Sequence, residues 1–430
     1  MLRLSSISLL DISIPSLLFW FILFFGYFGY PLLWFGLDPY RNADIVDQLI
    51  ILEMFCYSTV SITCLIAGFL VARVVLGPLR VAEALSSSFA KTLQGSRHFM
   101  ALNCLLFLIC GFVLYLYISE VGVANLGLLV ALDLVSSDSN VTALRSDASN
   151  GFANYHWYRV FTADILLFCT LFFASLYFYQ KSKFRAICFC LATITCALSL
   201  TLSGEKAQIM ELLIGLSLIF SIKYSGGKVP VRNIIKFSLI GLVVITPIYY
   251  FLMGASGIFE ALQQVGSRIF TGQIHPSYVY LQYFPEYRDF LFGATFPNPG
   301  SILPYEPVTI TQEIMAWDNP KEAAEGIIGS MPAMFWVEAY INFGVLSLPF
   351  ISLILGIFLY SINRFFFSLR FCPLVLSFYI WTILFYKDLA LSFFSDFFIN
   401  IYLFSTLLVF CVFYVISHRG IVFLAPRKLI

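Results

Sequence analysis

Long apolar runs recur along this chain and constrain its fold more than any other feature. A run of about twenty residues matches the length of helix that crosses about 30 Å of hydrocarbon. We place such runs at 14–35, 49–72, 99–119, 157–179, 186–202, 207–222, 237–253, 334–361, 372–386 and 398–416. Lipid offers no hydrogen-bond partners to the backbone, and these runs are too long for barrel strands, so the spans should be helices. The sequence therefore predicts an all-α, polytopic membrane protein of about ten transmembrane helices, forming one membrane domain over residues 1–430.

Charged residues are scarce, at 11% of the chain, and their distribution predicts an orientation. Cytoplasmic loops of membrane proteins carry an excess of Lys and Arg. Most of the 25 basic residues fall in alternate loops, which contain only Asp11 and Glu83 among the acids. We expect these loops and both termini to be cytoplasmic. The polar loops 120–156 and 254–332 should then lie on the outer side, and 254–332 is the large extracytoplasmic loop.

This large loop carries Arg268, His275 and Arg288, and the apolar run after it carries Glu338 and Asn342. Glu338 and Asn342 are four residues apart and so share a helix face. A desolvated carboxylate has a raised pKa, which suits a general base near neutral pH. The alternative is that Glu338 makes only a structural hydrogen bond.

Two further groups of charges interrupt apolar runs. Glu205 and Lys206 should form a tight turn at the outer surface, followed by Gln208 and Glu211 on the same helix face. This stripe predicts a wet cavity or a partner helix, and the alternative is a pair that caps the turn. Lys387 and Asp388 follow a span and are interpreted as a snorkelling pair at the membrane interface.

The motifs of several enzyme classes are missing. The sequence has no phosphate-binding Gly-x-x-x-x-Gly-Lys-Ser/Thr, no Asp-x-Asp and no His-Glu-x-x-His. Nucleotide-driven chemistry is therefore not expected, and no metal or other cofactor is implied. The basic residues are those that orientation requires, so nucleic-acid binding has no support.

Three stretches are of interest: FLFGATFPNPG at 290–300, PYE at 304–306 and GSMPAMFWVEAYINFG at 329–344. They resemble the O-antigen or oligosaccharide repeat-unit polymerases (Wzy) of bacterial inner membranes. The run of spans with one dominant outer loop late in the chain is similar as well. The resemblance implies an enzyme that transfers a growing glycan from undecaprenyl diphosphate to a lipid-linked repeat unit at the outer face of that membrane. The implied partners are these two lipid-linked oligosaccharides, membrane lipids and a chain-length regulator protein.

The residue inventory suits that reaction. A diphosphate leaving group needs fixed cations, and Arg binds phosphate in bidentate fashion. We expect Arg268 and Arg288 to take part in catalysis, with Glu338 or His275 as the base. The residues predicted to bind substrate are Arg145, Lys206, Glu205, Tyr278, Tyr283 and Asn342.

Two other functions remain open. A flippase for lipid-linked sugars would use the same charges along a translocation path, although such transporters usually show internal repeats. A ligase that joins the glycan to lipid A core would use the same donor.

Overall fold

The regular structure is almost entirely helical. The computed structural model describes residues 3–4, 7–8, 11–42, 45–79, 81, 85, 96–121, 155–202, 206–229, 246, 257–324, 326, 329–369 and 372–424. Within these residues the exception is an antiparallel pair of two-residue strands, β1 (Arg3–Leu4) and β2 (Ile7–Ser8).

Nine segments of this part of the chain are long and apolar enough to cross a membrane. They are Ile14–Trp34, Gln48–Leu76, Phe99–Glu120, His156–Tyr179, Lys183–Thr201, Gln208–Ser225, Ser347–Ser368, Pro373–Ala390 and Ser395–Ile416. The predicted class, a multi-pass helical membrane protein, is confirmed. The predicted span at 237–253 lies outside the described residues apart from residue 246.

The predicted span at 334–361 is wrong, because two helices occupy it. Helix α17 (Phe335–Phe343) ends at Gly344, and α18 (Ser347–Ser368) follows. Gly344 has a φ of 74°, a conformation that glycine adopts at low cost. Residues 335–342 of α17 are all buried inside the protein. Its apolar character therefore reflects a protein interior, which hydropathy does not distinguish from lipid.

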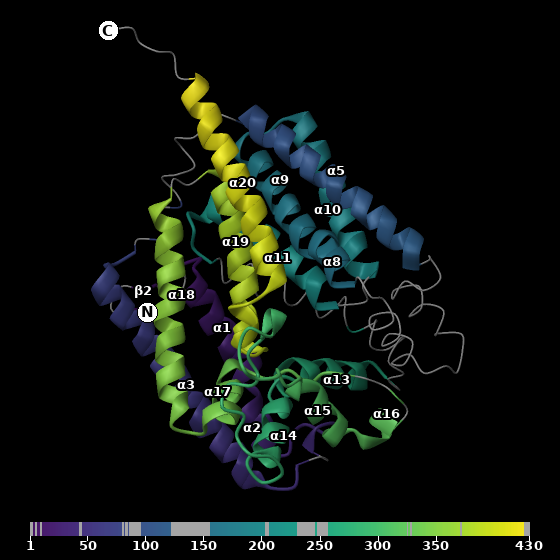
Figure 1. Ribbon diagram of the computed structural model, residues 1–430, viewed down its shortest axis with the longest axis vertical. Coiled ribbons are helices and arrows are strands. Elements are labelled where there is room, and N and C mark those ends of the chain that lie inside the picture. Colours follow the sequence, from purple (N-terminus) through teal and green to yellow (C-terminus); the bar gives the residue numbers. More distant parts are fainter. Residues whose placement is uncertain are drawn as a thin grey trace. The chain divides into compact units, whose positions relative to one another are not determined.

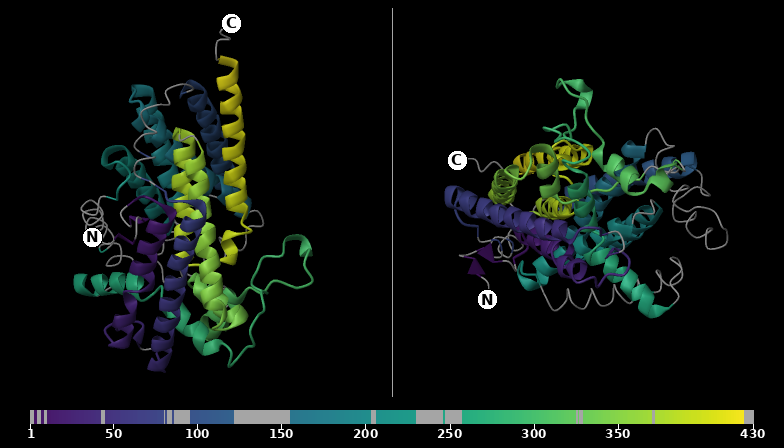
Figure 2. Two further views of the ribbon diagram at one scale, coloured as in Figure 1. Left: turned by 90° about the vertical axis from the view of Figure 1, so that its left-hand side faces the viewer. Right: turned by 90° about the horizontal axis from the view of Figure 1, so that it is seen from below.

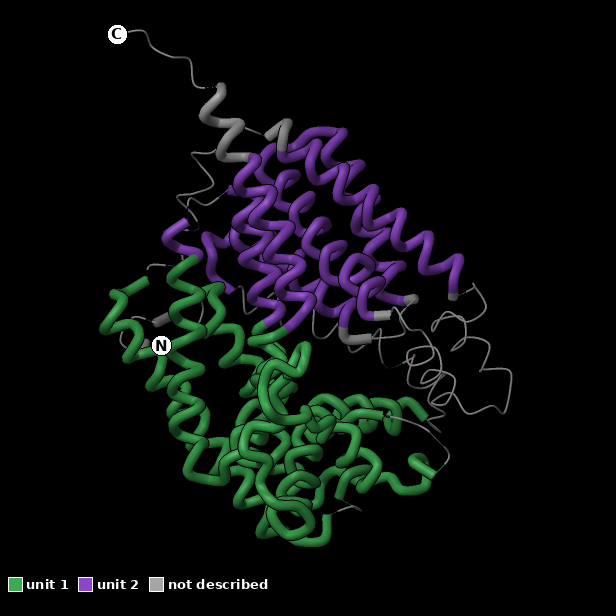
Figure 3. The backbone as a smooth tube through the Cα atoms, viewed as in Figure 1, with its two compact units in different colours: residues 1–79, 230–365, 386–399 green, residues 80–229, 366–385, 400–430 purple. Residues whose placement is uncertain are grey.

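The chain forms two compact units, and each is assembled from separate stretches of sequence (Figure 3). Unit 1 contains Met1–Leu79, Pro230–Phe365 and Tyr386–Ile399. Unit 2 contains Arg80–Val229, Phe366–Phe385 and Asn400–Ile430.

Unit 2 is a bundle of long helices around α9 (Figure 1). Its described helices are α5 (Ser96–Val121), α8 (Tyr155–Arg159), the π-helix η3 (Val160–Ile165), α9 (Leu166–Tyr179), α10 (Lys183–Leu202), α11 (Lys206–Ser225), most of α19 (Pro373–Lys387) and α20 (Ile401–Leu424). Helix α9 contacts α5, α10 and α11 and is apolar on all sides, as expected of a helix that is surrounded. Two of its polar side chains are bonded inside the bundle, because Thr170 donates to the Leu166 carbonyl and Ser175 is bonded by Ser377.

Unit 1 combines spans with shorter helices. Its described helices are α1 (Ile14–Gly26), α2 (Gly29–Trp34), α3 (Gln48–Leu76), α13 (Ile258–Phe270), α14 (His275–Tyr283), η4 (Pro299–Ser301), α15 (Ile310–Asp318), α16 (Pro320–Ala324), α17, most of α18, η5 (Asp388–Ala390) and η6 (Ser395–Phe397). Helices α3 and α18 cross where Gly68 meets Gly356. A Cβ on Gly68 would overlap the Leu353 carbonyl, and a Cβ on Gly356 would overlap the Leu65 carbonyl. Small residues thus let these two backbones touch, as in many membrane helix pairs.

The polar interval 254–332 is folded in its described part, where it forms α13, α14, α15 and α16. Helix α14 lies at the centre of this region and packs against α3, α15 and α17. Helix α13 crosses the direction of α1 (Figure 2) and contacts it. A further close approach occurs at Gly29 on α2, where a Cβ would overlap the Phe270 carbonyl at the end of α13.

Candidate functional site

Glu338 on α17 joins two distant segments of unit 1. Its Oε1 accepts a hydrogen bond of 2.7 Å from the Thr295 hydroxyl, and its Oε2 accepts one of 2.9 Å from the Ser395 backbone N–H. The side chain has no exposed surface. Both oxygens are therefore bonded, as a buried carboxylate requires.

Asn342, one turn further along α17, completes this arrangement. Its Nδ2 donates to Thr295 Oγ1 at 2.8 Å and to the Glu338 carbonyl at 2.8 Å. Its Oδ1 accepts from the Gly293 N–H at 2.8 Å. We call Glu338, Asn342, Thr295, Gly293 and Ser395 the Glu338 network. The predicted shared face of Glu338 and Asn342 is confirmed, and it contacts protein.

Burial sets the proton affinity of the Glu338 carboxyl. Desolvation raises its pKa from the ordinary 4.5 to about 7, against hydrogen bonds from Ser395 and Thr295 that favour the charged form. The charge of Asp396 raises the pKa further. The carboxyl therefore changes its charge near neutral pH.

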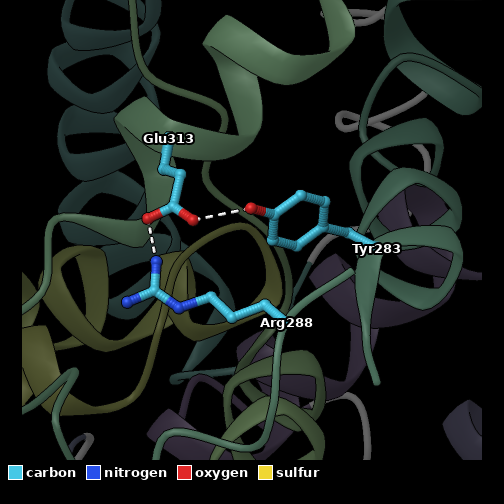
Figure 4. Close-up of polar contacts among 3 residues, drawn as sticks. All are labelled: Tyr283, Arg288 and Glu313. Carbon is cyan, nitrogen blue, oxygen red and sulfur yellow. Dashed lines mark hydrogen bonds and ion pairs between the residues drawn. The ribbon is translucent and has the colours of Figure 1, made fainter. Parts of the chain in front are cut away.

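Arg288 is paired with a carboxylate of the same unit (Figure 4). Its guanidinium forms an ion pair with Glu313 Oε2 on α15, while the Tyr283 hydroxyl donates to Glu313 Oε1 at 2.7 Å. Burial, and then the bond to Glu313, raise the pKa of Tyr283. Side chains of Arg288 and Glu313 stay 29% and 34% exposed, so the pair faces solvent in part. Arg288 thus has a carboxylate partner before any substrate arrives.

Arg268 lies near the end of α13 and is exposed. Among the described residues, none forms a hydrogen bond or an ion pair with its guanidinium. Glu260, Gln264 and Arg268 follow at intervals of four residues and share one face of α13. The apolar face is partly uncovered, since Ile258, Phe259 and Leu262 are 69%, 74% and 42% exposed.

Tyr278 and His275 lie inside the protein, at 0% and 2% exposure, on α14. The Tyr278 hydroxyl accepts from the Val46 and Asp47 backbone N–H groups at 2.9 Å each, and the rings of His275 and Tyr278 stack. The Tyr278 ring is therefore covered in this structure, and its part in substrate binding stays a prediction. Its hydroxyl holds the segment before α3.

The other residues predicted to bind substrate are largely undescribed. Arg145 and Glu205 lie outside the described residues, and Lys206 begins α11 without a described side chain. In the stripe that follows Glu205, Gln208 is 8% exposed and buried in unit 2.

The interpretation of Lys387 as a snorkelling residue is wrong. The residue is only 5% exposed, its Nζ lies 2.6 Å from Asp388 Oδ1, and it lies over the Phe21 ring of α1. The ammonium is held by the carboxylate of Asp388, which stays 32% exposed, and by an aromatic face.

Sequence reasoning missed two contributors. Thr295 connects Glu338 to Asn342, and the only sequence signal for it was its place in the 290–300 stretch.

Asp38 is the second. Its carboxylate accepts hydrogen bonds from the Thr271 hydroxyl and from the backbone N–H groups of Tyr40 and Arg41. Burial alone would raise the pKa of Asp38, but these hydrogen bonds outweigh it and lower the pKa. No local sequence pattern predicts this contact, because Thr271 lies 233 residues from Asp38.

Within the described residues, no group of three or more His, Cys, Asp or Glu side chains is placed to hold a metal ion. The chain matches no family model, no curated protein and no solved structure in the comparisons with known proteins. The assignment of function therefore has to come from the chemistry of the residues.

Proposed function

We propose that this chain is a bacterial inner-membrane polymerase of lipid-linked oligosaccharides. In this proposal it transfers a growing glycan from undecaprenyl diphosphate to a second lipid-linked repeat unit at the extracytoplasmic face. The local resemblance to the repeat-unit polymerases and the nine membrane-spanning segments of the described chain support this class of reaction.

The observation that carries the proposal is the placement of Arg268. An amphipathic helix with an uncovered apolar face lies in the plane of the membrane interface. Helix α13 has such a face at Ile258, Phe259 and Leu262, and its end touches Gly29, within the span Ile14–Trp34. Arg268 would then stand at the depth of lipid headgroups.

A diphosphate on a lipid carrier lies at that same depth. Arg268 has no partner among the described residues, so its planar fork of donors is available to two phosphate oxygens. Arg288 differs, because Glu313 already neutralises its charge. We therefore assign the leaving diphosphate to Arg268.

The chemical step requires one proton to move. The acceptor hydroxyl oxygen bonds to the anomeric carbon of the donor, the bond from that carbon to the diphosphate breaks, and undecaprenyl diphosphate leaves with the electron pair. Thr295 Oγ1 donates to Glu338 and accepts from Asn342, which leaves one acceptor position on the oxygen. We assign the acceptor hydroxyl to this position. It gives its proton to Thr295 Oγ1, while Thr295 passes its own proton to Glu338. The pKa of about 7 suits Glu338 to accept it.

The test is the length distribution of surface polysaccharide on gels. A deletion strain should carry single repeat units, and the wild-type gene should restore long chains. Loss of all surface polymer would instead favour a ligase. Accumulation of lipid-linked units on the cytoplasmic side would favour a flippase.

Arg268→Ala should lower the amount of long chains about tenfold to a hundredfold, the value of a lost charge-assisted hydrogen bond. Lys321→Ala is the matched control, since Lys321 is an exposed cation of α16 in the same region. Both variants should be checked for equal amounts in the membrane. Normal chains from Arg268→Ala would refute the assignment of the diphosphate to this residue.

A further inference from the structure

Three aromatic side chains form a partly exposed group on unit 1. The Tyr283 and Tyr287 rings stack at 6.0 Å between centroids with an angle of 16°. Trp317 lies 5.3 Å from Tyr283 and 5.4 Å from Tyr287, at 68° and 54°. Tyr287 is 64% exposed and Trp317 is 36% exposed. We call these three residues the aromatic platform.

The platform borders the partly exposed ion pair of Arg288 and Glu313. Tyr283 belongs to both groups, because its ring packs in the platform and its hydroxyl bonds Glu313 (Figure 4). The bond to Glu313 fixes the Tyr283 ring, and Tyr283 in turn supports Tyr287 and Trp317. The aromatic faces are thus held in position before a ligand binds, which lowers the entropy cost of binding.

We propose that the aromatic platform binds one sugar ring of the lipid-linked oligosaccharide. This inference rests on the proposed function for the identity of the sugar, and it adds a binding site that the transfer step does not use. A pyranose has an apolar C–H face that covers an aromatic ring, and hydroxyls at its rim that bond charged groups. The platform supplies the ring faces of Tyr287 and Trp317, with donors of Arg288 and acceptors of Glu313 beside them.

A lipid surface suits this place less well than a sugar does. Arg288 and Glu313 would lose water on contact with hydrocarbon, at a cost that their mutual attraction in solvent does not repay. A glycan instead replaces that water with hydroxyl groups.

The probe is the repeat-unit oligosaccharide released from the host's own lipid carrier by mild acid. Calorimetric titration of the full chain in detergent should detect its binding. Trp317→Ala and Tyr287→Ala should each raise Kd about threefold to tenfold, the value of one aromatic contact. Tyr287→Phe keeps the ring face and should leave Kd close to that of the wild type.

Trp34→Ala is the matched control, because Trp34 is 37% exposed in the same unit but lies on α2. Absence of binding by the wild type would overturn the proposal. So would an unchanged Kd in both alanine variants, or an equal loss in Trp34→Ala. A platform that becomes shielded from an aqueous quencher on reconstitution into lipid vesicles would face the membrane and would also overturn it. If the deletion strain keeps its long chains while these binding results hold, the proposed polymerase activity fails and the sugar site stands.

Discussion

The stability of this protein should depend on pH through Glu338. Its carboxyl is fully buried, and its pKa is raised to about 7 from an ordinary 4.5. The folded chain therefore holds a proton between pH 4.5 and 7 that the unfolded chain releases. Stability is present in full below pH 4.5 and is lost as the pH rises through 7, because the folded state must then accommodate a buried charge.

The size of this loss follows from the two pKa values. Each tenfold difference in proton affinity is about 1.4 kcal/mol, so the free energy of unfolding should fall by about 3 kcal/mol between pH 4.5 and pH 8. Glu338→Gln cannot ionise and should remove this dependence. Below pH 7 the wild-type carboxyl is protonated and, like the amide, turns a donor toward Thr295 or Ser395, so the variant should be about as stable as the wild type at low pH.

The assay is thermal unfolding of the detergent-solubilised chain at pH 5, 6, 7 and 8, followed by tryptophan fluorescence. The midpoint of the wild type should fall by several degrees across this range, whereas that of Glu338→Gln should not share this fall. Other groups titrate in the same window, so the difference between the two proteins is the quantity of interest. Glu306→Gln alters an exposed carboxyl and should keep the wild-type dependence. Parallel curves for the wild type and Glu338→Gln would refute the reasoning.

Two further predictions use the same thermal assay. Gly356→Ala should lower the midpoint, because its Cβ would overlap the Leu65 carbonyl, whereas Gly111→Ala meets open space and should be neutral or stabilising; equal midpoints would contradict the close crossing of α3 and α18. Tyr278→Phe should cost about 1 kcal/mol, because two backbone N–H groups lose their acceptor. Tyr40→Phe, at an exposed tyrosine, should cost less, and the reverse order would argue against the structural role of Tyr278.

Local sequence properties were sufficient for the membrane spans. A helix in lipid satisfies its own backbone hydrogen bonds, so apolar length alone identifies it. Nine of the ten predicted spans lie in the described residues, and eight of them correspond to one spanning segment each along their length. The run 334–361 failed because α17 is equally apolar for another reason, its burial against protein.

The candidate site could be predicted only in part. Glu338 and Asn342 were recognised as sharing a face because the helical period is local. Their partner Thr295 lies 43 residues from Glu338 and reaches it only through the fold. Arg268 and Arg288 were equivalent cations in the sequence. The fold separates them, since Glu313 pairs with Arg288 and leaves Arg268 exposed.

The sequence by itself determined that this is a multi-pass helical membrane protein and where most of its spans run, because lipid imposes that pattern on each segment independently. The tertiary structure decided which polar side chains are available for chemistry. The fold covers Tyr278, which was predicted to bind substrate, and bonds its hydroxyl to the backbone of Val46, 232 residues away. The fold also leaves Tyr287 exposed beside Trp317, where its ring is open to a ligand. The burial and hydrogen bonding of a side chain depend on residues far apart in the chain, so local sequence patterns do not predict them.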